Sequence, residues 1–484
     1  MPDQVPSFGL FAEAPDLRKS VPSLERLARG FPAYVARAER AQCMAREVAR
    51  DVILPKSLEL DKKCHEDPTY VDWDLWRELN RRKLTVSIVP ERMGGLGWGF
   101  FDMYAAMEEF VAADVGTTAL FMFNLFWTVC AFVEFRADVC LSVMRSMVEA
   151  QKRGEPLFFA WALTEANCGT DNLNRDALAT QRPTMRVDRV AGGWRINGSK
   201  HFISNGSLAH NVLVVAPTDP DNPLESFACF YVPTDSDGFS VGRVERKMGH
   251  KAKPTAELVL RDVFVPDENV WEPPGRGWRH TSEILAISTG AVGMLGVGMA
   301  RGALERCVRF ASGTRVGGRR LIEDNRVQVA IGRMLERVMT IRARCFDFAI
   351  GADALMATRL LDSAPVRAGL AAAPSRLLLG ESLAAIAGKG AVCEATSRYK
   401  HRLVPDETVE RVKAHGSAVK VAGTDLAMEV SSAVLDLVGL EGMDHRHGME
   451  KVFRDAKVAQ IYEGTNQVNL LGLFKHELGK GAGL

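Results

Sequence analysis

Helical and strand-like patterns follow one another in blocks along the chain, and this order constrains the fold more than any other feature of the sequence. From about residue 23 to 157, apolar residues recur three and four positions apart, as in residues 41–60 and 101–113, which is typical of amphipathic helices. Residues 158–270 contain short runs rich in Val, Phe and Leu, which are typical of strands. Helical patterns return after about residue 279. Elements grouped in this way predict segregated layers and argue against a doubly wound sheet.

The chain has 484 residues, too many for one hydrophobic core, and the blocks predict how it divides. We expect an irregular extension over residues 1–40, a helical domain over 41–157, a β domain over 158–280 and a helical bundle over 281–484. Within the bundle, a segment near residues 354–405 is rich in Ala, Leu and Arg, and we expect it to form an additional helical hairpin. The predicted fold class is α+β, mostly α, with the β domain built as a barrel or sandwich.

Charge and cysteine content narrow the class of protein. The chain has 61 Lys and Arg against 60 Asp and Glu, and this balance argues against a protein whose main task is to bind nucleic acid. Nine cysteines lie scattered without a C-x-x-C pair, which predicts neither a disulfide framework nor a metal site. The first residues lack the basic start and apolar run of a signal peptide, and the apolar stretch at 119–135 is short for a membrane span. We therefore expect a cytoplasmic protein without a transmembrane segment.

Two glycine clusters resemble nucleotide-binding loops, but neither has the required context. In residues 296–302 the final gap is one residue too long for a dinucleotide fingerprint, and the cluster lies in a helical stretch with no strand before it. We interpret these glycines as allowing two helices to approach closely. Residues 94–99 contain four glycines but no following Lys-Ser/Thr, so we predict a bent loop rather than a phosphate cradle.

Two Asn-Gly pairs, Asn197-Gly198 and Asn205-Gly206, flank residues 199–204. Asn-Gly is strongly favoured in two-residue hairpin turns, because both positions need a positive φ. We therefore expect one strand with a hairpin turn on either side.

The strongest local signal lies near the C-terminus, in Tyr462-Glu463-Gly464-Thr465-Asn466-Gln467. A helical pattern runs into Tyr462, breaks at Gly464 and restarts with Thr465 or Asn466 as the N-cap. Glu463 therefore stands on a break between helices, where its carboxylate can point into a cleft while the flanking helices hold it still. A base that removes a carbon-bound proton needs such a fixed and apolar setting. The spacing alone also suits a capping or surface glutamate, because glutamates are common at helix ends.

This hexapeptide, preceded by Arg454-Asp455-Ala456-Lys457, resembles the C-terminal signature of the acyl-CoA dehydrogenases. Further segments resemble motifs of that family in the expected order: Gly94-Gly95-Leu96-Gly97, Leu163-Thr164-Glu165-Ala166-Asn167-Cys168-Gly169-Thr170-Asp171, Asn197-Gly198-Ser199-Lys200-His201-Phe202-Ile203-Ser204-Asn205-Gly206, Lys247-Met248-Gly249 and Asp262-Val263-Phe264-Val265-Pro266. Several separate motifs in order are far more specific than any one of them.

The resemblance implies an N-terminal helical domain, a central β domain, a C-terminal four-helix bundle, and FAD bound between the β domain and the C-terminal helices. The residues implied to line the flavin and its pyrophosphate are Trp161, Leu163, Thr164, Gly169 and Thr170. Phe202 is implied to pack on the ring system, Ser204 to hydrogen-bond near N5, and Thr465 and Gln467 to meet the cofactor from the start of the last helix. The adenine half is implied to be completed from a neighbouring subunit by Arg315, Asp436 and Gly439.

The activity implied by the resemblance is α,β-dehydrogenation of an acyl-CoA or related acyl thioester in fatty acid and lipid metabolism. Glu463 would take the α-proton while the β-hydrogen leaves as hydride to flavin N5, giving the trans-2-enoyl thioester. The residues implied to contact the substrate are Thr170, Tyr462, Gly464 and Ser288. Implied partners are an electron-transfer flavoprotein or similar acceptor and further copies of the chain, as a homodimer or homotetramer.

The family can carry its base instead on the helix that follows the β domain, and here that position is Ser288. The nearest carboxylate, Glu283, is five residues away and on another face of the helix, which supports Glu463 as the base. Thr289 stands where an Arg that helps to hold the substrate is usual.

Two other functions share this fold. One is an acyl-CoA oxidase or flavin monooxygenase, in which oxygen reacts with the reduced flavin. The other is a helical interaction protein that has kept the fold and lost the chemistry, against which Glu463, Thr164 and Ser204 argue.

Overall fold

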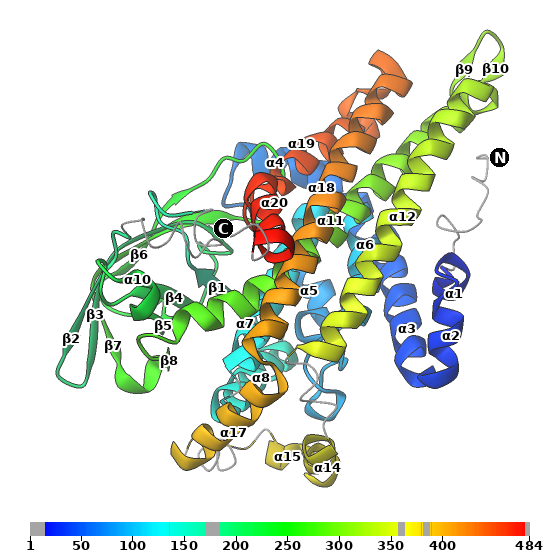
Figure 1. Ribbon diagram of the computed structural model, residues 1–484. Helices are drawn as coiled ribbons and strands as arrows, with labels where there is room; N and C mark the ends of the chain where they lie inside the picture. Colours follow the sequence, from blue (N-terminus) through cyan, green and yellow to red (C-terminus); the bar gives the residue numbers. More distant parts are fainter. Residues whose placement is uncertain are drawn as a thin grey trace.

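The computed structural model of the protein describes residues 15–134, 136–169, 183–356, 364–378, 380, 388 and 390–479. Helices form a first layer, two small sheets form the middle of the chain, and long helices form the last layer (Figure 1). This arrangement confirms the α+β, mostly helical fold class, with a separate sheet domain that the middle of the chain forms at one side of the molecule.

The first layer consists of α1 (Leu17–Ser20), α2 (Leu24–Gly30), α3 (Pro32–Val48), α4 (Ser57–Glu66), α5 (Trp73–Arg81), α6 (Phe100–Ala113), α7 (Val115–Glu134) and α8 (Ala137–Arg153). Local caps fix several of their ends. The Asp72 carboxylate accepts a hydrogen bond of 2.8 Å from the Leu75 N–H at the start of α5, and Gly154, with a φ of 70°, ends α8.

Helices α1, α2 and the first part of α3 lie where the sequence predicted an irregular extension. That prediction is wrong for residues 15–40, while residues 1–14 lie outside the described part. Pro32 is the first residue of α3, a position where its missing N–H costs nothing. Asp16 caps α1 by accepting from the Lys19 N–H at 2.9 Å. Pro32 and Asp16, which disfavour a helix interior, thus stand at helix starts, and the segment is helical despite them.

The β domain contains β1 (Phe159–Ala162), β2 (Arg186–Val190), β3 (Gly193–Ser204), β4 (Asn211–Pro217), the short helix α10 (Pro223–Ser226), β5 (Phe227–Pro233), β6 (Phe239–Val244), β7 (Thr255–Pro266) and β8 (Val270–Glu272). One sheet has the strand order β1-β4-β5-β8 and the other β2-β3-β7-β6, and β1 and β4 pair in parallel. Side chains of both sheets, among them Val214, Phe230 and Leu258, are buried in one cluster. The domain is therefore a sandwich.

The two Asn-Gly pairs do not form two hairpin turns. Strand β3 runs unbroken through Asn197-Gly198, where Gly198 has a φ of 137° and the register with β7 shifts. This pair is a bulge inside the strand, so the predicted turn there is wrong. Asn205, with a φ of 58°, does follow the end of β3, but β3 pairs with β2 and β7 rather than with the next strand.

The last layer is built on α11 (Gly277–Gly313), α12 (Asn325–Leu355) and α18 (Asp406–Gly442), which contact one another, with the shorter α19 (Met449–Ala459) and α20 (Asn466–Phe474) packed against α18. A small hairpin of β9 (Arg315–Val316) and β10 (Arg319–Arg320) joins α11 to α12. In Figure 1 these long helices run side by side past the β domain.

The glycines of α11 let it lie against α18 at close range, as predicted. A Cβ built on Gly296 would overlap the main chain of Gly423 on α18, and one built on Gly423 would overlap the main chain of Gly293. No strand precedes these glycines, because α11 is continuous from Gly277. The cluster is a helix-packing surface and not a nucleotide loop. The residue 94–97 loop is likewise bent, with Gly94 and Gly97 at positive φ.

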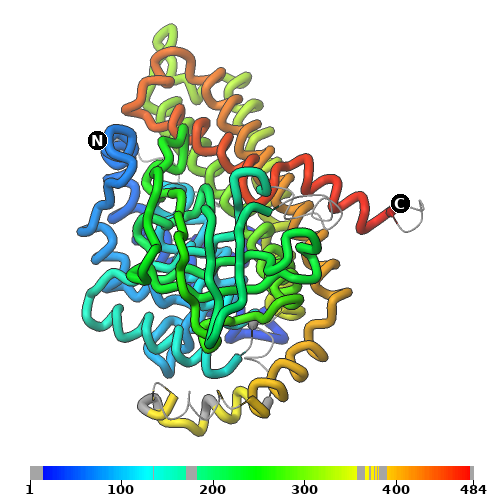
Figure 2. The backbone as a smooth tube through the Cα atoms, turned by 90° about the vertical axis from the view of Figure 1, so that its left-hand side faces the viewer, coloured from blue at the N-terminus to red at the C-terminus, as the bar shows by residue number. Residues whose placement is uncertain are grey.

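Between α12 and α18, the segment near residues 354–405 contains α14 (Ala364–Ala372), α15 (Ser375–Leu378) and α17 (Gly390–Leu403). In Figure 2 these helices run along the lower edge of the molecule. The sequence predicts an additional helical hairpin here. Helices are present, but residues 357–363, 379, 381–387 and 389 lie outside the described part, so the hairpin stays a prediction. At its end, Lys400 of α17 pairs with the buried Glu283 of α11, so this second carboxylate is held in an ion pair away from the base position.

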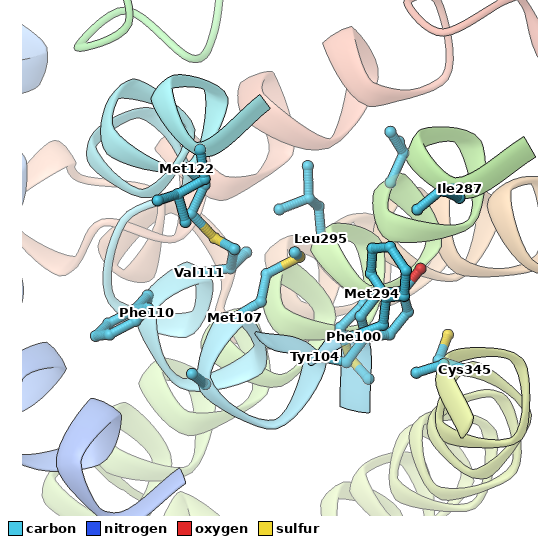
Figure 3. Packing of buried hydrophobic residues seen from close by; sticks show 14 of the residues in the cluster. Phe100, Tyr104, Met107, Phe110, Val111, Met122, Ile287, Met294, Leu295 and Cys345 are labelled. Atoms are coloured by element: carbon cyan, nitrogen blue, oxygen red, sulfur yellow. The ribbon is translucent and has the colours of Figure 1, made fainter. Parts of the chain in front are cut away.

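The first and last helical layers share one core. Figure 3 shows Tyr104 and Met107 of α6 among Ile287, Met294 and Leu295 of α11. Within the described residues, α7 and α11 are the helices long and apolar enough to cross a membrane, yet 83% and 94% of their most apolar windows are buried in the protein. Both are placed as core helices.

Candidate active site

Glu463 lies in the break between α19 and α20, as the sequence predicted. It has a φ of 53° and is followed by Gly464 with a φ of 75°, so two consecutive residues are left-handed. For a glutamate this conformation is strained and persists only where the surroundings enforce it. The Asn469 side chain donates to the main-chain O of Glu463 at 3.2 Å and of Gly464 at 3.0 Å. The base candidate thus stands on a fixed loop.

Lys420, on α18, holds the same loop from the other side. Its buried ammonium donates to the main-chain O of Gln460 at 3.2 Å, to that of Gly464 at 2.7 Å and to Asn466 Oδ1 at 2.5 Å. Burial lowers the pKa of Lys420 to about 8, although the charge of Glu463 acts in the opposite direction. All three of its hydrogen-bond donors are used in positioning the loop.

The carboxylate of Glu463 is half-buried and faces α11. Ser288 Oγ donates to Glu463 Oε2 at 2.9 Å, so the predicted alternative site for the base and Glu463 itself are direct neighbours. Burial raises the pKa of Glu463 above its ordinary value, and the Ser288 hydrogen bond, Lys420 and Lys253 oppose that rise. A carboxylate with a raised pKa is the better proton acceptor.

Lys253 connects Glu463 to the β domain. Its ammonium donates to Ser204 Oγ, at the end of β3, at 2.7 Å. The same ammonium lies 4.6 Å from the ring centroid of Phe123 on α7 and 5.6 Å from that of Tyr462. Ser204, Tyr462 and Glu463 are therefore brought together, as the resemblance implied.

The loop after β1 is tied to the end of β3. The main-chain O of Thr164 accepts from the His201 N–H at 2.9 Å, and that of Leu163 accepts from Lys200 Nζ at 2.8 Å. Trp161 and Gly169 are half-buried beside this loop. Thr170 lies outside the described residues.

Phe202 is held in a conformation that exposes its ring. Its φ is 58°, at a shift of register between β3 and β7, and 60% of the residue is exposed. A positive φ is rare for a bulky residue and marks a site where the surrounding structure imposes it. The result is a flat apolar face at the end of β3, beside Ser204, that is largely open.

Thr465 and Gln467 lie at the start of α20. Thr465 is the N-cap of that helix and its Oγ1 accepts from the Val468 N–H at 3.4 Å, which confirms the restart predicted from the sequence. Gln467 is exposed on the first turn. The first N–H groups of a helix are suited to an anion, so both residues stand where a phosphate group can be met.

The residues implied to reach the adenine half of the cofactor do not join this site within one chain. Arg315 is exposed in the β9–β10 hairpin, and Asp436 and the kink at Gly439, with a φ of 61°, lie near the end of α18. Both places are at the upper end of the long helices in Figures 1 and 2, away from the loop that holds Glu463. Their role across a subunit boundary stays a prediction.

Lys253 and Lys420 are the two functional candidates that sequence reasoning missed. Nothing local separates Lys253 from its neighbour Lys251, which pairs with Asp61 at 3.3 Å. Lys420 follows Ala418-Val419 and precedes Val421-Ala422, and no motif marks it. Their contacts come from distant parts of the chain, so only the folded structure distinguishes them. The one usable signal was the position of Lys253 just after Lys247-Met248-Gly249, a segment already assigned to the family pattern.

The site fits the flavin that the resemblance implies. Trp161 Nε1 and Tyr462 Oη are buried and have no hydrogen-bond partner among the described residues, and Phe202 offers an uncovered ring. A group bound at this site can supply the partners that these two atoms lack. In its charged form Lys253 can only donate, so Ser204 Oγ accepts from it and the Ser204 hydrogen can be donated to an acceptor such as a flavin nitrogen.

Comparison with protein families gives matches along most of the chain. The models described as acyl-CoA dehydrogenase N-terminal domain, middle domain and C-terminal domain match residues 36–135, 160–263, and 275–368 with 375–477.

Two curated relatives cover nearly the whole chain. A probable acyl-CoA dehydrogenase of Mycobacterium tuberculosis is 25% identical over 423 residues, which are 87% of this chain and 90% of the relative. The cyclohex-1-ene-1-carbonyl-CoA dehydrogenase of Geobacter metallireducens is 28% identical over 433 residues, which are 88% of this chain and 93% of the relative.

Three solved structures share the fold at a TM-score of 0.70. The butyryl-CoA dehydrogenase of Megasphaera elsdenii is 22% identical and covers 93% of this chain and 98% of its own. An acyl-CoA dehydrogenase of Bacillus anthracis, complexed with FAD, is 21% identical, and the match covers 93% of this chain and 68% of that one. A chain from a study of the electron transferring flavoprotein of Acidaminococcus fermentans is 23% identical, and the match covers 91% of this chain and 97% of that one.

Proposed function

Because the chain belongs to the acyl-CoA dehydrogenase family, we propose that Glu463 is the base with which this flavin oxidoreductase dehydrogenates an acyl-CoA between its α and β carbons. The cofactor is FAD, which supplies the acceptor for the hydride when it is bound. The observation that carries the proposal is the placement of the Glu463 carboxylate. It is half-buried, hydrogen-bonded to Ser288 and held on a loop that Lys420 and Asn469 fix, and burial there raises its pKa.

The chain's own residues account for the removal of the proton. Glu463 accepts the α-proton, and its raised pKa brings it closer to that of the carbon acid. Ser288 Oγ, at 2.9 Å from one carboxylate oxygen, orients the carboxylate so that its other oxygen faces the substrate. In this proposal the main-chain N–H of Glu463 donates to the thioester carbonyl and stabilises the charge that develops on it. Tyr462, Ser288 and Gly464 border the same space.

The residues toward the flavin keep the roles that the resemblance implies. Phe202 packs on the ring system, Ser204 donates near N5, and Trp161, Leu163, Thr164 and Gly169 line one side. Thr465 and Gln467 meet the cofactor at the start of α20. The supporting observations are the uncovered Phe202 ring and the Ser204 hydrogen that Lys253 leaves free.

The finer parts of the function rest on the relatives. We propose that an electron-transfer flavoprotein or similar protein takes the electrons, that the chain forms a homodimer or homotetramer which completes the adenine site with Arg315, Asp436 and Gly439, and that it works in the cytoplasm in fatty acid metabolism. The position of these three residues away from Glu463 supports the shared site.

Anaerobic mixing of the FAD-loaded protein with acyl-CoAs of increasing length tests the proposal. We expect at least one of them to bleach the flavin absorbance band and to be recovered as its trans-2-enoyl thioester. Bleaching without an enoyl product would overturn it. Rapid reoxidation by air, compared with a one-electron acceptor, identifies an oxidase instead.

A further inference from the structure

Lys253 differs from the other buried lysines of the described residues in how many acceptors and counter-charges surround its ammonium group. Lys200 has three acceptors, two of them main-chain carbonyls and the third Glu165. Lys451 pairs with Asp114 and Asp455, each at 2.7 Å, and Lys400 pairs with Glu283. Lys420 donates to the loop of residues 460–466 that carries Glu463, here called the base loop.

By contrast, Lys253 is 6% exposed and, among the described residues, has one hydrogen-bond acceptor, Ser204 Oγ, and no carboxylate within ion-pair distance. Its ammonium also lies over two aromatic rings, 4.6 Å from the centroid of Phe123 and 5.6 Å from that of Tyr462. An ammonium offers three donors, so two of them are left for another partner. A buried cation without a counter-charge is costly, and a bound anion would remove that cost.

We propose that Lys253 forms an anion subsite in the acyl pocket, so that the preferred substrate is an acyl thioester whose short acyl chain ends in a carboxylate. This rests on the proposed function, because Glu463 and the flavin contact of Ser204 decide which part of the substrate reaches Lys253. Lys253 thereby determines specificity.

The position of the ammonium sets the length of that chain. It donates to Ser204, which meets the flavin in the proposed function, and it lies 5.6 Å from the ring centroid of Tyr462, the residue before Glu463. The reacting carbons must lie between the flavin and Glu463, so a carboxylate that reaches Lys253 stands only a few bonds beyond them. Acyl chains of about four to six carbons meet this condition, since each extended C–C bond advances little more than ~1 Å.

The charge balance of the site favours the same ligand. Burial lowers the pKa of Lys253 to about 7, with Lys247 acting in the same direction and Glu463 against it. An anion bound at the subsite restores the charged form. The competing role is that Lys253 serves only as a distant counter-charge for Glu463, and in that case it does not discriminate between acyl chains.

The test compares kcat/KM, with an artificial electron acceptor, for acyl-CoAs of four, five and six acyl carbons that end either in a carboxylate or in a methyl group. We expect the wild-type protein to have the higher kcat/KM for the carboxylate series. Lys253→Gln should reduce the ratio of kcat/KM for the carboxylate series to kcat/KM for the methyl series about tenfold or more, because a hydrogen bond to a charged group is lost. Lys253→Arg, which keeps the charge, should retain most of the preference. Lys251→Met removes a lysine two positions away and should leave the ratio unchanged.

FAD content and thermal unfolding of each variant separate a change in specificity from a loss of structure, and Lys253→Met carries the same comparison if the Gln variant fails to fold. A wild-type preference for the methyl series, or a ratio unchanged in Lys253→Gln, overturns the subsite while leaving the proposed function in place. If neither series reduces the flavin, the proposed function fails and the subsite fails with it.

Discussion

Partial desolvation makes a carboxylate more basic but costs folding free energy, and the Glu463 carboxylate lies in such a setting. Its pKa is raised by burial, and its backbone is left-handed, which is unfavourable for a glutamate. Ser288, Lys420 and Asn469 hold it in that state. A residue that is strained and desolvated, yet fixed by several partners, is typical of a site selected for chemistry rather than stability.

Replacing Glu463 with Gln should therefore separate activity from stability. We expect dehydrogenation to fall by about 10²- to 10⁴-fold, the usual contribution of a general base, while FAD stays bound.

The same variant tests the effect of burial on stability. When folding raises the pKa of a carboxyl, that group destabilises the folded protein at every pH above its ordinary pKa of 4.5. Glu463→Gln should thus be more stable than the wild type at neutral pH, with a difference that shrinks as the pH falls toward 4.5. Urea unfolding at several pH values measures this, and a variant less stable at neutral pH would argue against the desolvated carboxylate.

Lys420 should act on the reaction through Glu463. Lys420→Met removes three hydrogen bonds from the base loop, and we expect kcat to fall about tenfold to 100-fold, as for a small displacement of a reacting group. The positive charge that favours the ionised base is lost too, so the acidic limb of the pH–rate profile should move to higher pH. Lys457→Met, which removes an exposed lysine that bonds to Gln460, is the control. An unshifted profile would mean that Lys420 is only structural.

Single residues were predicted from the sequence where the signal was local. The break at Gly464, an N-cap at Thr465 or Asn466 and the placing of Glu463 between two helices all follow from residues within a few positions of one another, and the structure selects Thr465 as the cap. The role of Lys253 could not be predicted, because its contacts lie on β3, on α7 and at the base loop.

At the scale of elements, patterns that repeat along a helix were more informative than turn signals. The glycines of α11 predicted close packing, and their partner surface on α18 confirms it. The pair Asn197-Gly198 carries a strong hairpin signal, yet pairing of β3 with β7 on one side and β2 on the other keeps the strand continuous. Long-range pairing outweighs a local turn preference there.

Two glycine-to-alanine substitutions should therefore have opposite effects. Gly423→Ala places a methyl group against the main chain of Gly293, and we expect it to cost about 1–3 kcal/mol or more of unfolding free energy. Gly332→Ala, on α12 with open space around it, should add up to about 1 kcal/mol through helix propensity. Denaturant unfolding of both variants gives the comparison, and equal effects would show that α11 and α18 are not in close contact.

At the scale of the whole molecule, a buried ion network joins the first and last helical layers. Arg301 of α11 pairs with Glu109 of α6 at 2.5 Å and with Glu108 at 3.1 Å, and Arg342 of α12 pairs with Glu108 at 2.8 Å. The order of the layers was predictable from the blocks of the sequence. The charged pairs between them were not, because they join helices far apart in the chain.

The network should make the protein sensitive to acid. Burial alone raises the pKa of Glu109, but Arg301 and Arg46 outweigh it and lower the pKa to about 2. A carboxyl with a lowered pKa stabilises the fold above its ordinary value of 4.5, and that stability is lost as the pH falls toward 2. Glu109→Gln should cost about 3–5 kcal/mol at neutral pH and progressively less in acid.

The control for that variant is Glu305→Gln, which removes a half-exposed carboxylate 3.1 Å from the same arginine and should cost less than about 1 kcal/mol. The free energy of unfolding of each variant, measured from neutral to acidic pH, distinguishes Glu109→Gln from Glu305→Gln. Equal losses in both variants would show that burial of the network adds nothing.

The most direct test of the central claim isolates proton removal from oxidation. An acyl-CoA with sulfur in place of its β carbon has no β-hydrogen to lose, so exchange of its α-hydrogens in D₂O, followed by NMR, reports the base alone. We predict that the FAD-loaded wild-type protein exchanges them, and that Glu463→Gln binds the same compound but exchanges it about 10²- to 10⁴-fold more slowly. Exchange at the wild-type rate in Glu463→Gln would show that another residue removes the proton.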